Sequence, residues 1–150
     1  MRPDLDAARA VLKRHFGYPD FRGAQRPAIE AVLAGRDVMV LMPTGGGKSL
    51  CYQVPAAVLP GITIVVSPLI SLMQDQVDRL DAAGIPSAFV NSTLERDEAE
   101  ARMEAAEKGR IKLLFVAPER FDSERFRARL PRLDVSLFAV DEAHCISQWG

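Results

Sequence analysis

The chain has 150 residues, of which 48% are hydrophobic and 26% are charged, and its formal net charge is −1. This composition is typical of one globular domain with a buried core and excludes an intrinsically disordered chain. A net charge this close to zero gives no sign of a nucleic-acid partner, so such a partner can be inferred only from local motifs. The two cysteines lack Cys-x-x-Cys spacing and indicate neither a disulfide framework nor a zinc site.

Apolar residues at helical spacing predict two helices at the start of the chain. The first contains residues 5–12 and ends at Gly17, and the second contains residues 29–33 and ends at Gly35. Residues 37–41 then predict the first strand.

A glycine-rich loop follows this strand and leads into a helix that begins near Leu50; it reads Met42-Pro43-Thr44-Gly45-Gly46-Gly47-Lys48-Ser49. Strand, loop and helix in this order predict a phosphate-binding loop. Its glycines let backbone N–H groups turn toward phosphate, Lys48 would contact the β- and γ-phosphates, and Ser49 would bind Mg²⁺. The strict pattern has glycine in place of Met42, and a purely structural glycine turn is the alternative.

The rest of the chain alternates strands with helices. Strands are predicted over residues 62–66, 87–90, 111–116 and 135–140. Helices are predicted to start at Ser67-Pro68 and end at Gly84, to run from a capping box at residues 92–95 to about Lys108, and to span residues 125–130. This alternation predicts an α/β fold with a mostly parallel central sheet and helices on both faces.

Polar and glycine-rich segments stand at the carboxyl ends of these strands, where ligands bind in parallel sheets. The last strand ends in Asp141 and Glu142. Beside a phosphate-binding loop, an acid such as Asp141 holds Mg²⁺, and Glu142 can deprotonate the attacking water. The alternative is that both acids cap a short helix.

These motifs together resemble a known family. Asp141-Glu142-Ala143-His144 after a strand, with the upstream glycine loop, resembles superfamily 2 helicases. The continuation through Trp149 to Gly150 resembles RecQ-family DNA helicases, as do residues 16–25, 67–76 and 117–120. The resemblance implies the first RecA-like motor lobe of an ATP-dependent DNA helicase with 3′-to-5′ polarity.

The resemblance also implies roles for single residues. Gln25 would read the adenine edge, with Arg22 assisting and Tyr18 stacking on the base; a helix start with a core aromatic is the alternative. Lys48, Asp141, Glu142 and His144 would form the catalytic set, with His144 linking nucleotide to the DNA-sensing loop. The single-strand path would be lined by Ser67, Pro68, Leu69, Ser71, Asn91, Pro118, Glu119, Arg120 and Trp149.

We therefore expect residues 1–150 to be one ATP-binding lobe, ending inside the aromatic-rich loop, with a second lobe and its arginine finger elsewhere in a longer chain. Expected ligands are ATP, Mg²⁺, single-stranded DNA and tailed duplex DNA. An RNA helicase lobe and a regulatory ATPase remain alternatives. Without a signal core or membrane-spanning run, we expect a soluble protein with no membrane partner, at the nucleoid in bacterial cytoplasm or in a eukaryotic nucleus.

Overall fold

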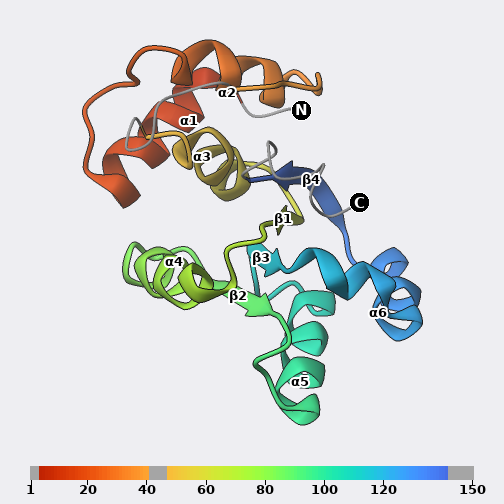
Figure 1. Ribbon diagram of the computed structural model, residues 1–150. Coiled ribbons are helices and arrows are strands. Elements are labelled where there is room, and N and C mark those ends of the chain that lie inside the picture. The colour runs from red at the N-terminus through yellow and green to blue at the C-terminus, as the bar shows by residue number, and fades with distance from the viewer. Residues whose placement is uncertain (1–3, 41–46, 142–150) are drawn as a thin grey trace. The chain divides into compact units, whose positions relative to one another are not determined.

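The structure, a computed structural model, describes residues 4–40 and 47–141. The chain forms two compact units, Met1–Pro60 and Gly61–Gly150. Figure 1 labels the elements of both units, and each unit is described by itself below.

The first unit is helical and confirms the helices expected there. Helix α1 (Leu5–Val11) is capped by Asp4, whose side chain accepts a hydrogen bond from the backbone N–H of Ala7 at 3.0 Å. It continues into one π-helical turn, η1 (Leu12–Phe16), which ends at Gly17 with a left-handed φ of 77°. Helices α2 (Gln25–Leu33) and α3 (Leu50–Val58) complete the unit. Its core is formed by Ala8, Leu12, Ile29, Leu33, Leu50 and Val54.

The strand expected over residues 37–41 is wrong for the residues that the structure describes. Residues 36–40 have no regular secondary structure, and Leu41 lies outside the described residues. Val38 is 38% exposed and Met39 is 82% exposed. Strand preference depends on packing against a neighbouring strand, and no described strand pairs with this segment.

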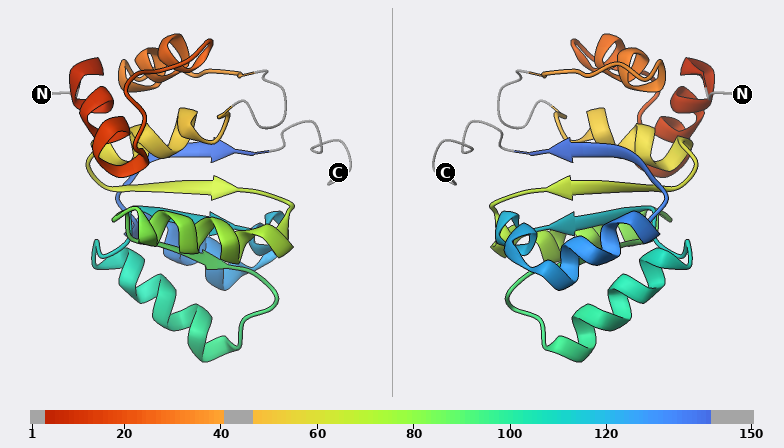
Figure 2. Two further views of the ribbon diagram at one scale, coloured as in Figure 1. Left: turned by 90° about the vertical axis from the view of Figure 1, so that its left-hand side faces the viewer. Right: turned by 90° about the vertical axis from the view of Figure 1, so that its right-hand side faces the viewer.

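The second unit is a parallel sheet of four strands in the order β2-β3-β1-β4. The strands are β1 (Ile62–Val66), β2 (Ser87–Val90), β3 (Leu113–Val116) and β4 (Val135–Val140). Between them run α4 (Ile70–Ala82), α5 (Arg96–Glu107) and α6 (Glu124–Arg129), with the 3₁₀ turns η2 (Pro118–Asp122) and η3 (Leu130–Arg132) flanking α6. Helix α4 lies on one face of the sheet and α6 lies on the other (Figure 2). The predicted α/β fold is therefore confirmed.

One hydrophobic core of this unit fills the space between the sheet and helices α5 and α6. Ile62, Ile64 and Val66 of β1 point into it together, because alternate side chains of a strand share one face. Met103 of α5 and Phe126 of α6 meet them. All five residues of β1 are buried, which explains why its sequence is β-branched throughout and apolar except at Thr63.

Two predicted helix starts are wrong. Helix α4 begins at Ile70, because the Ser67 hydroxyl accepts the N–H of Leu69 at 3.2 Å and closes a turn before the helix. Helix α5 takes its capping box from Glu95 and Glu98 instead of residues 92–95. Residues 92–95 do not start the helix, because Oδ1 of the buried Asn91 side chain accepts a hydrogen bond from the backbone N–H of Thr93 at 2.9 Å and holds this segment in a turn. Both cases show short polar side chains favouring turns over helix starts.

Replacing a core residue of the sheet should cost far more than the same replacement on a helix surface. Leu114 on β3 is completely buried, so Leu114→Ala should lower the free energy of unfolding by about 2–5 kcal/mol. The matched control is Leu72→Ala on α4, where the side chain is 47% exposed and the expected change is within about 0.5 kcal/mol. Urea unfolding of both variants tests this, and equal losses would contradict the described core.

Candidate functional site

The end of the predicted phosphate-binding loop lies on the first turn of α3. Backbone N–H groups of Leu50 and Cys51 donate to the carbonyls of Gly47 and Lys48, both at 3.1 Å, which orders this turn. Ser49 occupies the N-cap position, but its side chain makes no capping hydrogen bond. Its hydroxyl is thus not committed to the helix end and suits a hard cation. Thr44, Gly45 and Gly46 lie outside the described residues.

One buried side chain ties the predicted base-reading segment to this loop. Gln25 is 4% exposed; its Nε2 donates to the carbonyl of Gly47 at 3.1 Å and its Oε1 accepts the N–H of Arg22 at 2.9 Å. Because one partner is a carbonyl and the other an N–H, the amide orientation is unambiguous. The amide keeps one hydrogen and one lone pair beyond these two bonds, so it retains the capacity to pair with a ligand.

Gly47 is required at its position for two reasons. Its φ is +75°, a left-handed conformation that side chains disfavour. A Cβ added there would also lie 2.3 Å from Nε2 of Gln25. The contact between Gln25 and the loop therefore depends on the missing side chain.

The segment between α1 and α2 is fixed by a short polar network. Oδ1 of Asp20 accepts the N–H of Phe21 at 2.8 Å and Nε of Arg9 at 3.1 Å. Both hydrogen bonds lower the pKa of Asp20 below its ordinary value, and the bond from the backbone N–H of Phe21 has the larger effect. Tyr18 is 45% exposed, so the alternative that placed this aromatic ring in the core is wrong. Arg22 is exposed as well.

In the second unit, backbone hydrogen bonds align the residues that follow the four strands at one edge of the sheet. The ladder continues one residue past the strands: Asp141 donates its N–H to Val66 at 2.8 Å, and Ser67 donates to Val116 at 3.1 Å. Ala117 donates to Val90 at 3.4 Å. Ser67, Ala117 and Asp141, which begin three of the predicted segments, therefore lie at the same edge of the sheet; the predicted segment of residues 43–49 belongs to the first unit. Glu142, His144 and Trp149 lie outside the described residues.

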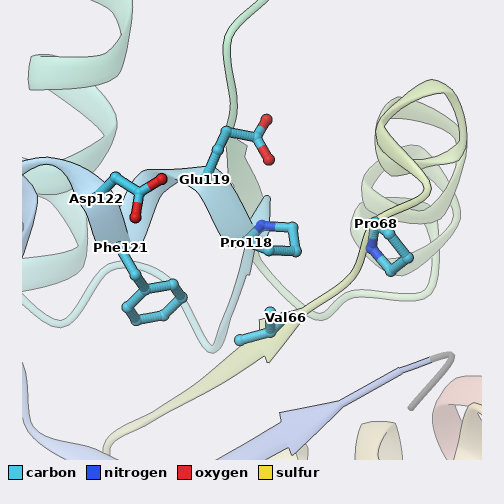
Figure 3. A pocket seen from close by; sticks show the side chains of 6 residues that line it. All are labelled: Val66, Pro68, Pro118, Glu119, Phe121 and Asp122. Carbon is cyan, nitrogen blue, oxygen red and sulfur yellow. The ribbon is translucent and has the colours of Figure 1, made fainter. Parts of the chain in front are cut away.

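A pocket of about 470 Å³ opens between the end of β1 and η2, and Figure 3 shows its lining. Val66, Pro68 and Phe121 supply apolar surface, while Glu119 and Asp122 supply two carboxylates. No cationic side chain is among these lining residues. A phosphate chain near this pocket would have to be held by backbone N–H groups or by cations outside it.

Two predicted DNA contacts are buried and support loops. Ser67 is 2% exposed and Asn91 is 1% exposed. The Ser67 hydroxyl accepts a hydrogen bond from the backbone N–H of Leu69, and Oδ1 of Asn91 accepts one from the backbone N–H of Thr93. Ser71 and Pro68 lie beside the first of these loops, and Arg120 follows β3 on η2. Sequence reasoning missed Phe121 and Asp122 as lining residues, because only the 3₁₀ turn brings them to the pocket.

Residues 22–150 match the DEAD/DEAH box helicase family. The chain belongs to this family. It is 50% identical over 97% of its length to the ATP-dependent DNA helicase RecQ of Bacillus subtilis (strain 168) and 48% identical over 95% to that of Haemophilus influenzae. It is also 45% identical over 93% to the probable ATP-dependent DNA helicase RecS of Bacillus subtilis.

The resemblance to RecQ DNA helicases is thereby confirmed. The chain spans about a quarter of the length of the first two relatives, 25% and 23%. Among the residues that the structure describes, no helix has the length and apolar character needed to cross a membrane.

The dependence of the loop on glycine can be tested with two matched substitutions. Gly23→Ala meets only the left-handed backbone penalty, about 1–2 kcal/mol, since nothing lies within 4 Å of the added Cβ. Gly47→Ala should cost more because it also displaces Gln25. Urea unfolding of both variants, repeated in a Gln25→Ala background, measures the excess. An excess that persists without the Gln25 side chain would refute the contact.

Proposed function

We propose that this chain is the ATP-binding lobe of a RecQ-type ATP-dependent DNA helicase, which couples ATP hydrolysis to 3′-to-5′ translocation on single-stranded DNA and to unwinding. The hydrogen bond between Gln25 and Gly47 carries the proposal on the structural side. It joins a segment suited to the base with a loop suited to the phosphates, as a ligand spanning both requires. Both relatives are named as DNA helicases, which favours DNA over RNA as the substrate.

In this proposal the nucleotide is held by residues of the first unit. Gln25, Arg22 and Tyr18 contact adenine, since Gln25 retains one donor and one acceptor and Tyr18 is exposed. Backbone N–H groups of residues 44–47 bind the phosphates, and Lys48 neutralises charge on the β- and γ-phosphates.

Hydrolysis in this proposal depends on Ser49, Asp141, Glu142 and His144. The hydroxyl of Ser49 and the carboxylate of Asp141 are hard oxygen ligands that suit Mg²⁺, which would neutralise phosphate charge when bound. Glu142 accepts a proton from the attacking water. His144 relays the state of the nucleotide to the loop that contains Trp149.

The DNA strand in this proposal crosses the carboxyl edge of the sheet. Backbone N–H groups and short hydroxyls grip its phosphates without reading sequence. The partners are single-stranded and tailed duplex DNA, together with a second RecA-like lobe that supplies an arginine finger. Such a protein works at the bacterial nucleoid or in the eukaryotic nucleus, and residues 1–150 form its first lobe.

Lys48→Ala in the full-length protein should lower DNA-stimulated ATP hydrolysis by at least about a hundredfold. The variant lacks the ammonium group that would stabilise the negative charge developing on the phosphates in the transition state. Lys108→Ala is the control: Lys108 is exposed and pairs only with Glu104 of α5, so turnover should be unchanged. A phosphate-release assay with single-stranded DNA measures both. Parental turnover in Lys48→Ala would remove the basis for the phosphate-binding role.

Gln25→Ala should reduce the preference for ATP over GTP by about tenfold, because an adenine edge left unpaired costs about 1–3 kcal/mol. Competition binding with both nucleotides measures the ratio. The variant also loses the bond to Gly47, which should weaken both nucleotides together. Equal weakening with an unchanged ratio would assign Gln25 to loop support alone.

A further inference from the structure

A second pocket of about 440 Å³ lies on the α5 and α6 side of the carboxyl edge. Four arginines line it: Arg96 at the start of α5, Arg120 on η2, and Arg125 and Arg129 on α6. Among the described residues of the lining, Glu100 is the only acidic one. We name this site the arginine pocket.

Only one of the four arginines in the arginine pocket is ion-paired with described residues. Arg129 is engaged by two carboxylates: its Nε donates to Glu107 at 2.7 Å and its Nη1 donates to Glu100. Arg96, Arg120 and Arg125 form no ion pair with any described residue. The pocket therefore presents three guanidinium groups, from three separate elements, that form no ion pair with a described residue.

Arg120 gives a second, independent sign of a ligand site. Its Nε is buried and has no hydrogen-bond partner among the described residues. A buried donor without an acceptor is costly, and more so on a charged group. An anionic oxygen in the pocket would satisfy this donor and neutralise the guanidinium at once.

The shape of the lining selects among anions. Leu94 and Met103 are apolar members of the lining, which suits the C–H surface of a sugar between two phosphates. Phe126 also lines the pocket, but it is 5% exposed and packs edge-on against Phe121 at 5.3 Å. No open ring face is therefore offered to a base, and recognition must go through the backbone.

We propose that the arginine pocket binds consecutive phosphates of single-stranded DNA, with Arg96 and Arg125 as phosphate ligands beside Arg120. The inference rests on the proposed DNA helicase function and extends its DNA path beyond the motif residues. The carboxylates of Glu119 and Asp122 in the first pocket repel phosphate, whereas Arg120 faces the arginine pocket. The two sides of η2 thus differ in charge, and the DNA strand is expected on the side that carries Arg120.

The test is binding of a fluorescent oligothymidylate to the full-length protein over a range of salt concentrations. Arg96→Gln combined with Arg125→Gln should weaken binding about tenfold or more at low salt. It should also reduce the slope of log affinity against log salt by about 1.4, since each phosphate contact on a single strand contributes about 0.7. Both side chains are exposed, so folding should be unaffected. ATP hydrolysis without DNA should be unchanged.

The matched control combines Arg79→Gln with Arg110→Gln, which removes the same charge from exposed positions outside the pocket. It should keep the parental slope. A parental slope in the Arg96 and Arg125 variant, with the parent binding DNA, would overturn the inference and leave the helicase proposal intact. Failure of the parent to bind DNA would overturn both. Loss of binding to a polyglutamate peptide with DNA binding retained would overturn the inference in favour of an acidic protein partner.

Discussion

The backbone ladder of β1 with its two neighbours is the constraint on which the second unit depends. β1 pairs in parallel with both β3 and β4, and its hydrogen-bond pattern continues past the strand ends to Ser67 and Asp141. Parallel pairing carries every following loop to the same edge. The side chains there differ in chemistry, but their position is decided by main-chain bonds. Substitutions in these loops should therefore alter ligand contacts more than they alter the sheet.

In the first unit, a side chain, instead of a backbone ladder, holds two predicted site segments together. Gln25 is buried with both ends of its amide bonded to backbone, one to the α1–α2 segment and one to Gly47. A buried amide is stable only while both partners stay in place. If Gly47 moves, the Gln25 amide loses its acceptor, and the hydrogen bond from the N–H of Arg22 to the same amide is weakened as well. We regard this as the physical link between base recognition and phosphate binding in the proposed lobe.

Much of this organisation can be predicted from sequence because it follows from local pattern. The apolar run of β1 predicts a strand buried on both faces, and Gly17 predicts a helix end, as the structure confirms. Residues 37–41 show the limit, since strand preference alone did not produce pairing in the described residues. The capping box at residues 92–95 failed because Asn91, a buried side chain, redirected the turn. The arginine pocket could not be predicted, because only the β2-β3 neighbourhood brings Arg96, Arg120 and Arg125 together.

The strand order has a consequence for how the chain reaches this structure. Thr63 of β1 pairs with Leu113, and Ile64 pairs with Phe138, so the central strand is synthesised long before either neighbour. Pairing of such distant segments slows folding, because the intervening loop must close first. Until then, an uncharged run of five β-branched residues without proline is open to association with other chains. The strand that organises the finished unit is thus also an aggregation hazard during synthesis.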